Sequence, residues 1–305
     1  MEKKPLIAYG WLRALLYIVI GIPLGISLSF GTDLLINGSY TTDKGNVAVP
    51  IFTFLQQYIL FNYGLILVVF FFRKVIDKRT IYSLGFEWNG HRTNAWTGFF
   101  TAMMILFVGS LILVSTKHLY FTNAFFNIYY FLTAIGLYII VAFVEEIIFR
   151  GYILNNLMQS MNKWWALIIS SLIFAATHLG NDNVQVLSIV NIFVAGLLLG
   201  INYIYTHNLW FGIFMHFGWN FFQGSVLGYN VSGIGIEPGS SIMQQSINGP
   251  EFLTGGKFGF EGSIICPALL LIMLFVFILE YERKKKRAEH DAEYLREMKE
   301  LHEIE

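Results

Sequence analysis

Two adjacent glutamates and an arginine interrupt a long apolar run of this chain. Glu145, Glu146 and Arg150 lie in the segment FVEEIIFRG at residues 143–151. Ionised side chains at membrane depth are costly, so they are rare and mark functional sites by default. We therefore interpret this segment as the working site, with a structural ion pair at the membrane border as the alternative interpretation.

The spacing of these three residues predicts different surroundings for the two glutamates. On a helix, Glu146 and Arg150 are four residues apart and share one face, with the acid N-terminal to the base, the more favourable order. Glu145 is rotated by about 100° from Glu146 and cannot share that pairing equally. The pattern predicts one carboxylate neutralised by Arg150 and one left for other work, such as general base catalysis.

The composition places these residues in a membrane protein. The chain has 305 residues, of which 55% are hydrophobic, 17% aromatic and 13% charged, with a mean hydropathy of +0.58. These values exclude an ordinary soluble domain and indicate a polytopic, all-α membrane protein. The formal net charge is zero, which gives no support for a nucleic-acid partner. The single cysteine, Cys266, excludes an intrachain disulfide and a metal site built from several cysteines.

Apolar segments of near-spanning length predict about eight transmembrane helices. We expect three parts: N-terminal membrane helices without a motif at 1–127, a catalytic membrane core at 128–281 and a charged cytoplasmic tail at 282–305. The first segment is interpreted as an anchor rather than a cleaved signal. The eight segments are 11–30, 51–72, 96–115, 128–149, 164–178, 184–205, 209–227 and 264–281.

Basic residues predict that both termini are cytoplasmic. They gather before the first span, between the second and third spans at 73–92, and after the last span at 283–287, whereas the two intervening loops carry one lysine each, Lys44 and Lys117. The tail also has a short apolar stripe that includes Tyr294 and Leu295. A helix on the membrane surface, a contact with a second copy of the chain and a solvated tail are all compatible with this stripe.

Three further polar residues interrupt apolar segments that follow the glutamates. His178 ends the segment FAATH, and His216 and Asn220 stand four apart in HFGWN, which places both on one helix face. Counting residues from the turns near 160–162 and 206–208 places these side chains and both glutamates within about one helical turn of a common depth. The sequence therefore predicts one cavity, inside the bilayer, that is walled by four helices.

The three motifs together resemble a known family. The patterns EExxxR, FxxxH and HxxxN, in this order on consecutive membrane helices, are similar to those of the CAAX proteases and bacteriocin-processing enzymes (CPBP or Abi family), which include the eukaryotic CAAX prenyl endopeptidase. The matching residues are Glu145, Glu146, Arg150, Phe174, His178, His216 and Asn220. The glycine-rich stretch at 254–263 also looks like one that precedes the last helix in bacterial members. The resemblance covers about 131–281.

The resemblance implies an intramembrane endopeptidase. Glu145, helped by His178, would deprotonate a water that attacks the scissile carbonyl. His216 and Asn220 would donate hydrogen bonds to the oxyanion, and Glu146 with Arg150 would support the site. No serine or cysteine stands in a nucleophile arrangement.

A zinc site formed by Glu145, His178 and His216 is the alternative mechanism. The usual HExxH signature is absent, so we favour the mechanism without a metal cofactor. Glu261 is interpreted as an exposed loop acid, although a place at the cavity mouth is the other interpretation.

Two other functions compete with proteolysis. A non-catalytic membrane scaffold or bacteriocin-immunity protein would tolerate changes at Glu145 and His178. A transporter could use Glu145 and Glu146 as a proton relay, but no internal repeat is visible. The expected partners are a hydrophobic or lipidated peptide substrate and the lipid bilayer, with self-association left open. The charge bias favours a bacterial inner membrane.

Overall fold

The computed structural model describes residues 4–37, 51–235 and 239–302. A helix lies over each of the eight predicted apolar segments. Segments labelled η are π-helical or short 3-10 turns. The first part contains α1 (Gly10–Leu16), η1 (Tyr17–Gly21), α2 (Ile22–Asn37), α3 (Ile51–Phe71), η2 (Phe72–Ile76), η3 (Ile81–Leu84), α4 (Arg92–Ser115) and β1 (Leu119–Ala124). The second part contains α5 (Ile128–Glu146), η4 (Ile147–Leu154), α6 (Asn155–Met158), α7 (Lys163–Ala176), α8 (Val186–Ile201), α9 (Tyr203–Thr206), α10 (Trp210–Asn220), η5 (Phe221–Val226), β2 (Met243–Ile247), α11 (Glu251–Thr254), η6 (Gly256–Phe258), η7 (Phe260–Gly262) and α12 (Ile265–His302).

Several of these helices are long and apolar enough to cross a membrane. Within the described residues there are five such spans, and α7 is a shorter apolar helix. The prediction of a mostly helical membrane protein is therefore confirmed. The total of eight spans, the division at 127 and 128 and the cytoplasmic side of the termini stay predictions, and the loop with Lys44 lies outside the described residues. The five spans are Gly10–Thr32, Arg92–Ser115, Ile128–Met158, Val186–Thr206 and Ile265–Arg296.

An asparagine begins each of the three helices that carry a motif. The Oδ1 atom of Asn127 accepts from the backbone N–H of Tyr129 at 2.9 Å at the start of α5. Asn162 does the same for α7, with Trp164 N at 2.9 Å, and Asn208 accepts from Trp210 N at 3.0 Å at the start of α10. Such caps satisfy backbone donors that a first helical turn leaves free.

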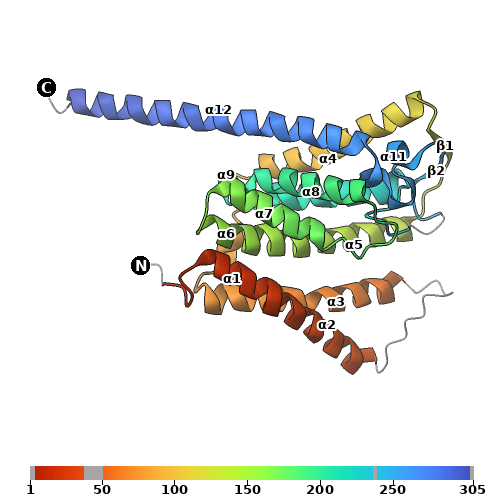
Figure 1. The fold of residues 1–305 in the computed structure, drawn as a ribbon, viewed down its shortest axis with the longest axis horizontal. Coiled ribbons are helices and arrows are strands. Elements are labelled where there is room, and N and C mark those ends of the chain that lie inside the picture. The colour runs from red at the N-terminus through yellow and green to blue at the C-terminus, as the bar shows by residue number, and fades with distance from the viewer. Residues whose placement is uncertain (1–3, 38–50, 236–238, 303–305) are drawn as a thin grey trace.

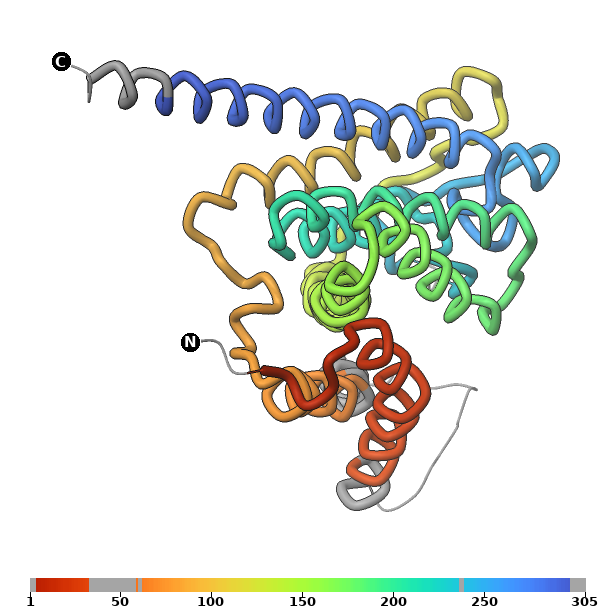
Figure 2. Tube along the Cα trace, turned by 60° about the vertical axis from the view of Figure 1, so that its left-hand side comes forward, coloured from red at the N-terminus to blue at the C-terminus, as the bar shows by residue number. Residues whose placement is uncertain are grey.

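The helices form layers around α5. In Figure 1, α12 lies along the top, α4, α7 and α8 fill the middle, and the α2 and α3 pair forms the lowest layer. Figure 2 shows α5 almost end-on, between that pair and the remaining helices. Helix α5 contacts α3 on one side and α10 on the other. The first described residues and the far end of α12 lie at the same end of the bundle (Figure 1).

A buried ionic cluster joins the N-terminal helices to the continuation of α5. Asp77 accepts from Arg13 Nη1 at 3.0 Å and from Arg73 Nη1 at 2.9 Å, and all three side chains are at most 1% exposed. The hydroxyl of Tyr152 and the amide of Asn156 donate to the same carboxylate at 3.3 Å each. This cluster, called the Asp77 cluster below, connects α1 and η2 to η4 and α6.

A two-stranded antiparallel sheet closes the opposite end of the bundle. Strand β1 pairs with β2 from Leu119 opposite Ile247 to Ala124 opposite Met243, with a bulge at Thr122. The all-α prediction did not include this sheet, because each strand lies in a segment that we expected to be a loop. The strands connect the segment after α4 to the long segment before α12.

Small residues bring α7 and α8 close together. A Cβ atom added to Gly196 would be 3.0 Å from the Cβ of Ser171, and one added to Gly200 would be 2.5 Å from Leu167 Cδ1. Glycine at these two positions therefore allows the close helix contact.

The charged tail does not form a separate element. Helix α12 continues without a break to His302 and extends past the body of the molecule (Figure 1). The tail therefore projects as a continuation of the last span, and its exposed Tyr294 and Leu295 are not covered within the chain.

Candidate active site

Glu146 and Arg150 form the ion pair that their spacing predicted. Arg150 Nη1 donates to Glu146 Oε1 at 2.8 Å, and the two side chains are 2% and 0% exposed. Arg150 Nη2 donates to the backbone carbonyl of Gly196 at 3.1 Å, and the guanidinium lies 4.5 Å from the ring centre of Phe174. Arg150 thus ties η4 to α8 and α7 as well as neutralising Glu146.

His216 lies between the two glutamates. Its Nδ1 atom is 3.1 Å from Glu146 Oε1, and its Nε2 atom is 3.9 Å from Glu145 Oε2. The Glu145 side chain is 30% exposed, whereas Glu146 is fully buried. With Nδ1 engaged by a carboxylate, the imidazole is fixed in orientation and presents Nε2 toward Glu145.

One carboxylate oxygen of each glutamate has no hydrogen-bond partner. Glu145 Oε2 and Glu146 Oε2 are both buried and unpaired. Buried carboxylate oxygens normally have partners, so unpaired ones call for a functional or solvent explanation. The Oε2 atom of Glu145 is the same atom that faces His216 Nε2.

Helix α10 keeps the space beside Glu146 open by means of a glycine. A Cβ atom added to Gly212 would lie 2.5 Å from Glu146 Oε2. Gly212 is one turn before His216, so both residues face the same carboxylate. No larger residue fits there without moving the glutamate.

His178 lies in the same pocket but not beside Glu145. Its Nδ1 atom is 3.0 Å from the carbonyl of Phe174, one turn earlier in its own helix. Among the described residues, no hydrogen bond or ion pair joins His178 to Glu145. The help that we expected His178 to give Glu145 would therefore pass through a water, and the imidazole that faces Glu145 within ion-pair distance is that of His216.

The phenylalanine of the FxxxH motif, Phe174, packs against both histidines of the site. Its ring centre is 4.9 Å from that of His178 and 6.3 Å from that of His216, both in edge-on arrangements. The same ring packs on Arg150. The Phe174 ring thus contacts the Arg150 guanidinium and the imidazoles of His178 and His216, and it fixes the spacing between them.

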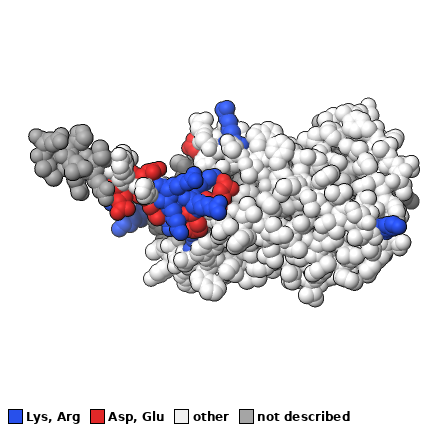
Figure 3. Space-filling model, turned by 90° about the horizontal axis from the view of Figure 1, so that it is seen from above, with Lys and Arg blue, Asp and Glu red and all other residues white. Residues whose placement is uncertain are grey.

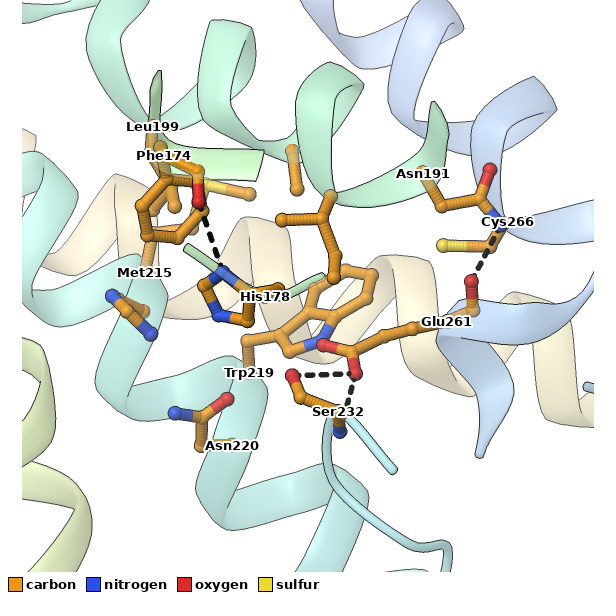
Figure 4. A pocket seen from close by; sticks show the side chains of 13 residues that line it. Phe174, His178, Asn191, Leu199, Met215, Trp219, Asn220, Ser232, Glu261 and Cys266 are labelled. Carbon is orange, nitrogen blue, oxygen red and sulfur yellow. Dashed lines mark hydrogen bonds between the residues drawn. The ribbon is translucent and has the colours of Figure 1, made fainter. Parts of the chain in front are cut away.

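A small pocket is lined by three of the six predicted site residues, His178, His216 and Asn220, whereas Glu145, Glu146 and Arg150 are not among its lining residues (Figure 4). Its volume of about 40 Å³ is enough for a water molecule or two. Asn220 is 6% exposed and lines the pocket, one turn after His216. The lining includes Phe174, His178, His216, Trp219, Asn220 and Glu261.

Glu261 is a pocket residue, and its interpretation as an exposed loop acid is wrong. The residue is 8% exposed. Its Oε1 atom accepts from the Trp219 indole at 2.8 Å, and Oε2 accepts from the backbone N–H and hydroxyl of Ser232 at 2.7 and 3.0 Å. Figure 4 shows Glu261 and Ser232 bonded at the side of the pocket opposite Phe174. Glu261 therefore fastens two loop segments to the helix that carries His216.

The glycine-rich stretch gives Glu261 this buried position. Gly255 and Gly259 have φ values of +90° and +99°, which favour glycine, and a Cβ atom on Gly255 would be 1.9 Å from the carbonyl oxygen of Gly259. Asn191 of α8 donates to the backbone carbonyls of Glu261 and Ser263. The glycines were the signal in the sequence that a tightly folded segment, rather than an open loop, precedes the last helix.

The residues of the alternative zinc site are not gathered as a ligand set. Among the described residues, no group of three or more histidine, cysteine, aspartate or glutamate side chains is arranged to hold a metal ion. His178 is directed to Phe174 rather than to the Glu145 and His216 pair. The side chains present do not fit such a metal, and we derive no step through one.

A comparison with protein-family models finds a match in this region. Residues 126–222 match the model of the family described as Rce1-like, type II CAAX prenyl endopeptidase. These residues are similar to an Rce1-like domain, and they are called the Rce1-like domain below. The match covers about a third of the 305 residues and contains all seven motif residues from Glu145 to Asn220, whereas Glu261 lies outside it. The resemblance predicted from the three motifs is confirmed over this range.

No curated protein and no solved structure matches the chain. The matching family is described as an endopeptidase family. The surroundings of Glu145 then decide what each side chain of the Rce1-like domain can do in that reaction.

Proposed function

We propose that this chain is an intramembrane endopeptidase that hydrolyses a peptide bond with a water activated by Glu145. The observation that carries the proposal is the unpaired Oε2 atom of Glu145, which faces His216 Nε2 at 3.9 Å. One water can bridge two atoms at this separation. A carboxylate within reach of that water meets the geometric requirement for a general base.

In the proposed reaction, Glu145 both takes up and returns the transferred proton. Glu145 takes a proton from water as the oxygen attacks the scissile carbonyl, and later gives it to the leaving nitrogen. The Nε2–H of protonated His216 and the amide of Asn220 donate to the oxyanion of the tetrahedral intermediate. Glu146 supports this role, because its carboxylate accepts from His216 Nδ1 and is itself held by Arg150.

His178 has a supporting role in this proposal. Its ring lines the pocket, and its Nδ1 atom is taken by the carbonyl of Phe174. The remaining ring nitrogen, Nε2, can hold water or the substrate carbonyl. It would assist Glu145 through the bound water rather than by direct contact.

The substrate class follows from the family and from the apolar surroundings of the site. The family name specifies CAAX prenyl endopeptidases, which act on prenylated peptides. We propose that a lipidated or hydrophobic peptide reaches Glu145 from the bilayer.

The test compares the wild-type chain with Glu145→Gln in liposomes. A fluorogenic farnesylated CAAX peptide serves as the probe, and membrane peptides from cells with either variant are compared by mass spectrometry. We expect cleavage to fall by about 100-fold or more, the usual contribution of a general base. Glu251→Gln, which changes an exposed carboxylate bonded to Gln185, is the matched control.

Two results would count against the proposal. Turnover by Glu145→Gln at the wild-type rate would show that another group activates the water. Identical peptide profiles from wild-type and Glu145→Gln membranes, without probe cleavage by either, would favour the non-catalytic scaffold.

A further inference from the structure

A second pocket lies at the end of the bundle where α12 leaves the body. Its volume is about 550 Å³, and it is bounded by the start of α7, by α9 and by α12. It shares no residue with the small pocket that His178 and His216 line. The side chains used below are Lys163, Tyr205, Thr206, Tyr281, Lys284 and Lys285.

The lining of this pocket is positively charged. Three lysines line it and no carboxylate does. Along α12, residues 280–287 contain two glutamates and five lysines or arginines, an excess of three positive charges. Figure 3 shows charged side chains gathered along this part of α12, whereas most of the body on that face has none.

The lysines of α12 can exchange their carboxylate partners for another anion. Lys284 pairs with Glu280 at 2.5 Å and Lys285 with Glu289 at 3.7 Å, and both lysine side chains are more than half exposed. Exposed pairs of this kind contribute little, so that a better anion can replace the glutamates. Lys163 Nζ lies 3.4 Å from the ring centre of Tyr205 and has no carboxylate partner within salt-bridge distance among the described residues.

Aromatic residues place this pocket at the depth of lipid headgroups. The rings of Tyr205 and Tyr281 are stacked with centres 4.8 Å apart, and Trp164 contacts Tyr205 edge-on at 6.1 Å. The neighbouring Trp165 is 63% exposed. Tryptophan and tyrosine gather at both interfaces of a bilayer, where their polar atoms reach water.

We propose that this pocket binds the phosphate of an anionic phospholipid in the adjacent leaflet. Lysine ammonium groups are point-charge ligands for phosphate, and basic pockets between membrane helices suit anionic headgroups. Lys163 would approach from α7 and Lys284 and Lys285 from α12. The stacked tyrosines would form the wall beside the glycerol, and acyl chains would lie along the apolar part of α12.

Native mass spectrometry of the full chain, released from a neutral detergent, tests the proposal. Phosphatidylglycerol is titrated against phosphatidylcholine with the same acyl chains, and inorganic phosphate forms a third arm. The variant K284Q/K285Q removes two charges that line the pocket. The variant K286Q/R287Q removes two charges from the same helix that do not line it.

We expect the wild-type chain to retain one phosphatidylglycerol in preference to phosphatidylcholine. Each pocket lysine should contribute about fivefold in affinity, so K284Q/K285Q should bind about 25-fold more weakly. K286Q/R287Q should stay within about twofold of wild type, and K163Q should weaken binding about fivefold.

Three results would overturn the proposal. Equal losses in the two double variants would show general attraction to a basic helix rather than a site. Equal retention of phosphatidylcholine would show that acyl chains alone bind. Displacement of phosphatidylglycerol by an equal concentration of inorganic phosphate would show that the pocket takes free phosphate and not a lipid.

Discussion

At the scale of single residues, Glu145 and Glu146 follow each other in the chain but have different surroundings. Glu146 is fully buried and accepts from Arg150 and from His216 Nδ1, whereas Glu145 is partly exposed and keeps an unpaired oxygen. One helical step of about 100° is enough to separate a structural carboxylate from a reactive one. Replacement by glutamine should therefore affect mainly stability at Glu146 and mainly activity at Glu145.

The first prediction concerns Glu146→Gln. This change removes the counter-charge of the buried Arg150, which should destabilise the protein by about 3 kcal/mol and lower its melting temperature in detergent. Glu145→Gln should change stability by less than about 1 kcal/mol while removing activity, since the Glu145 side chain is 30% exposed and its Oε2 atom makes no hydrogen bond. Equal melting temperatures for both variants would contradict the assigned roles.

The second prediction concerns Glu261. In Glu261→Gln the side-chain oxygen can still accept from Trp219, but the amide NH2 group then faces Ser232 and accepts from neither of its two donors. An unsatisfied buried donor costs about 1 to 3 kcal/mol, so faster hydrogen exchange is expected at residues 228–235, with activity reduced about tenfold. Ser232→Ala, which removes only the hydroxyl, should show a smaller effect.

A result in which Glu261→Gln loses activity while exchange at 228–235 is unchanged would contradict this prediction. Glu261 would then act on the substrate rather than by positioning Trp219.

Short-range contacts of the site could be predicted from the sequence, and long-range ones could not. The pair of Glu146 and Arg150 follows from helical periodicity alone. Glu261 was misinterpreted because its partners lie 29 and 42 residues away, beyond any helical repeat. His178 was expected beside Glu145 from equal helix arms, but its Nδ1 atom bonds within its own helix.

At the scale of secondary structure, the helix widens within the EExxxR motif and directly after the HxxxN motif. The π-helical segment η4 begins at the residue after Glu146, and η5 begins at the residue after Asn220. Such insertions are frequent at functional sites because they change the direction of side chains within a helix. No periodic pattern of residue types indicates such insertions, so the depth estimated for Glu145 and His216 assumed regular helices.

The third prediction concerns the approach of α10 to α5. Gly212→Ala should reduce activity, because the added Cβ would lie 2.5 Å from Glu146 Oε2 and displace the carboxylate from His216. Overpacking of this kind costs about 1 to 3 kcal/mol. Gly31→Ala in α2 is the matched control: nothing lies within 4 Å of its Cβ, so stability should rise by about 0.5 to 1 kcal/mol.

Activity assays and thermal unfolding of both glycine variants check this prediction. Wild-type activity in Gly212→Ala would show that the carboxylate of Glu146 can move without consequence.

The sheet could not be predicted for a related reason. Strands β1 and β2 are separated by more than a hundred residues, both are short, and β1 is mostly exposed whereas β2 is partly buried. Neither has the apolar alternation that indicates a strand. Their pairing depends on α4 and the segment before α12 ending close together.

At the scale of the whole molecule, the Asp77 cluster joins the N-terminal helices to the Rce1-like domain. One carboxylate faces two buried guanidinium groups, so Asp77 is the shared counter-ion of Arg13 and Arg73. Tyr152 and Asn156, which extend the helix of Glu145 and Glu146, bond to the same group. The part of the chain without a motif is thereby tied to the motif helix.

The fourth prediction is that Asp77→Asn destabilises the protein by about 3 to 5 kcal/mol, because both arginines lose their counter-charge. Thermal unfolding in detergent, with trypsin cleavage near Arg13 and Arg73, measures the effect. Glu280→Gln removes an exposed pair with Lys284 and should cost less than about 1 kcal/mol. A loss of stability for Asp77→Asn no larger than that for Glu280→Gln would show that the Asp77 cluster does not hold the N-terminal helices to the Rce1-like domain.

The positions of all eight apolar segments were predicted from hydropathy, because each is a continuous run with clear ends. The arrangement around α5 was not, since apolar helices have no polar face that fixes their neighbours. Arg13, Arg73 and Asp77 are separate in the sequence, and no short spacing links the first two.

Helix α12 carries residues of both pockets. Cys266 borders the small pocket, and Lys284 borders the basic one, about 27 Å away along the same unbroken helix. A stiff rod of this kind transmits a tilt or a sliding movement at one end to the other. The composition of the surrounding membrane could then set the rate of peptide cleavage through a purely mechanical linkage, and by reciprocity a bound peptide would change which lipids the protein retains.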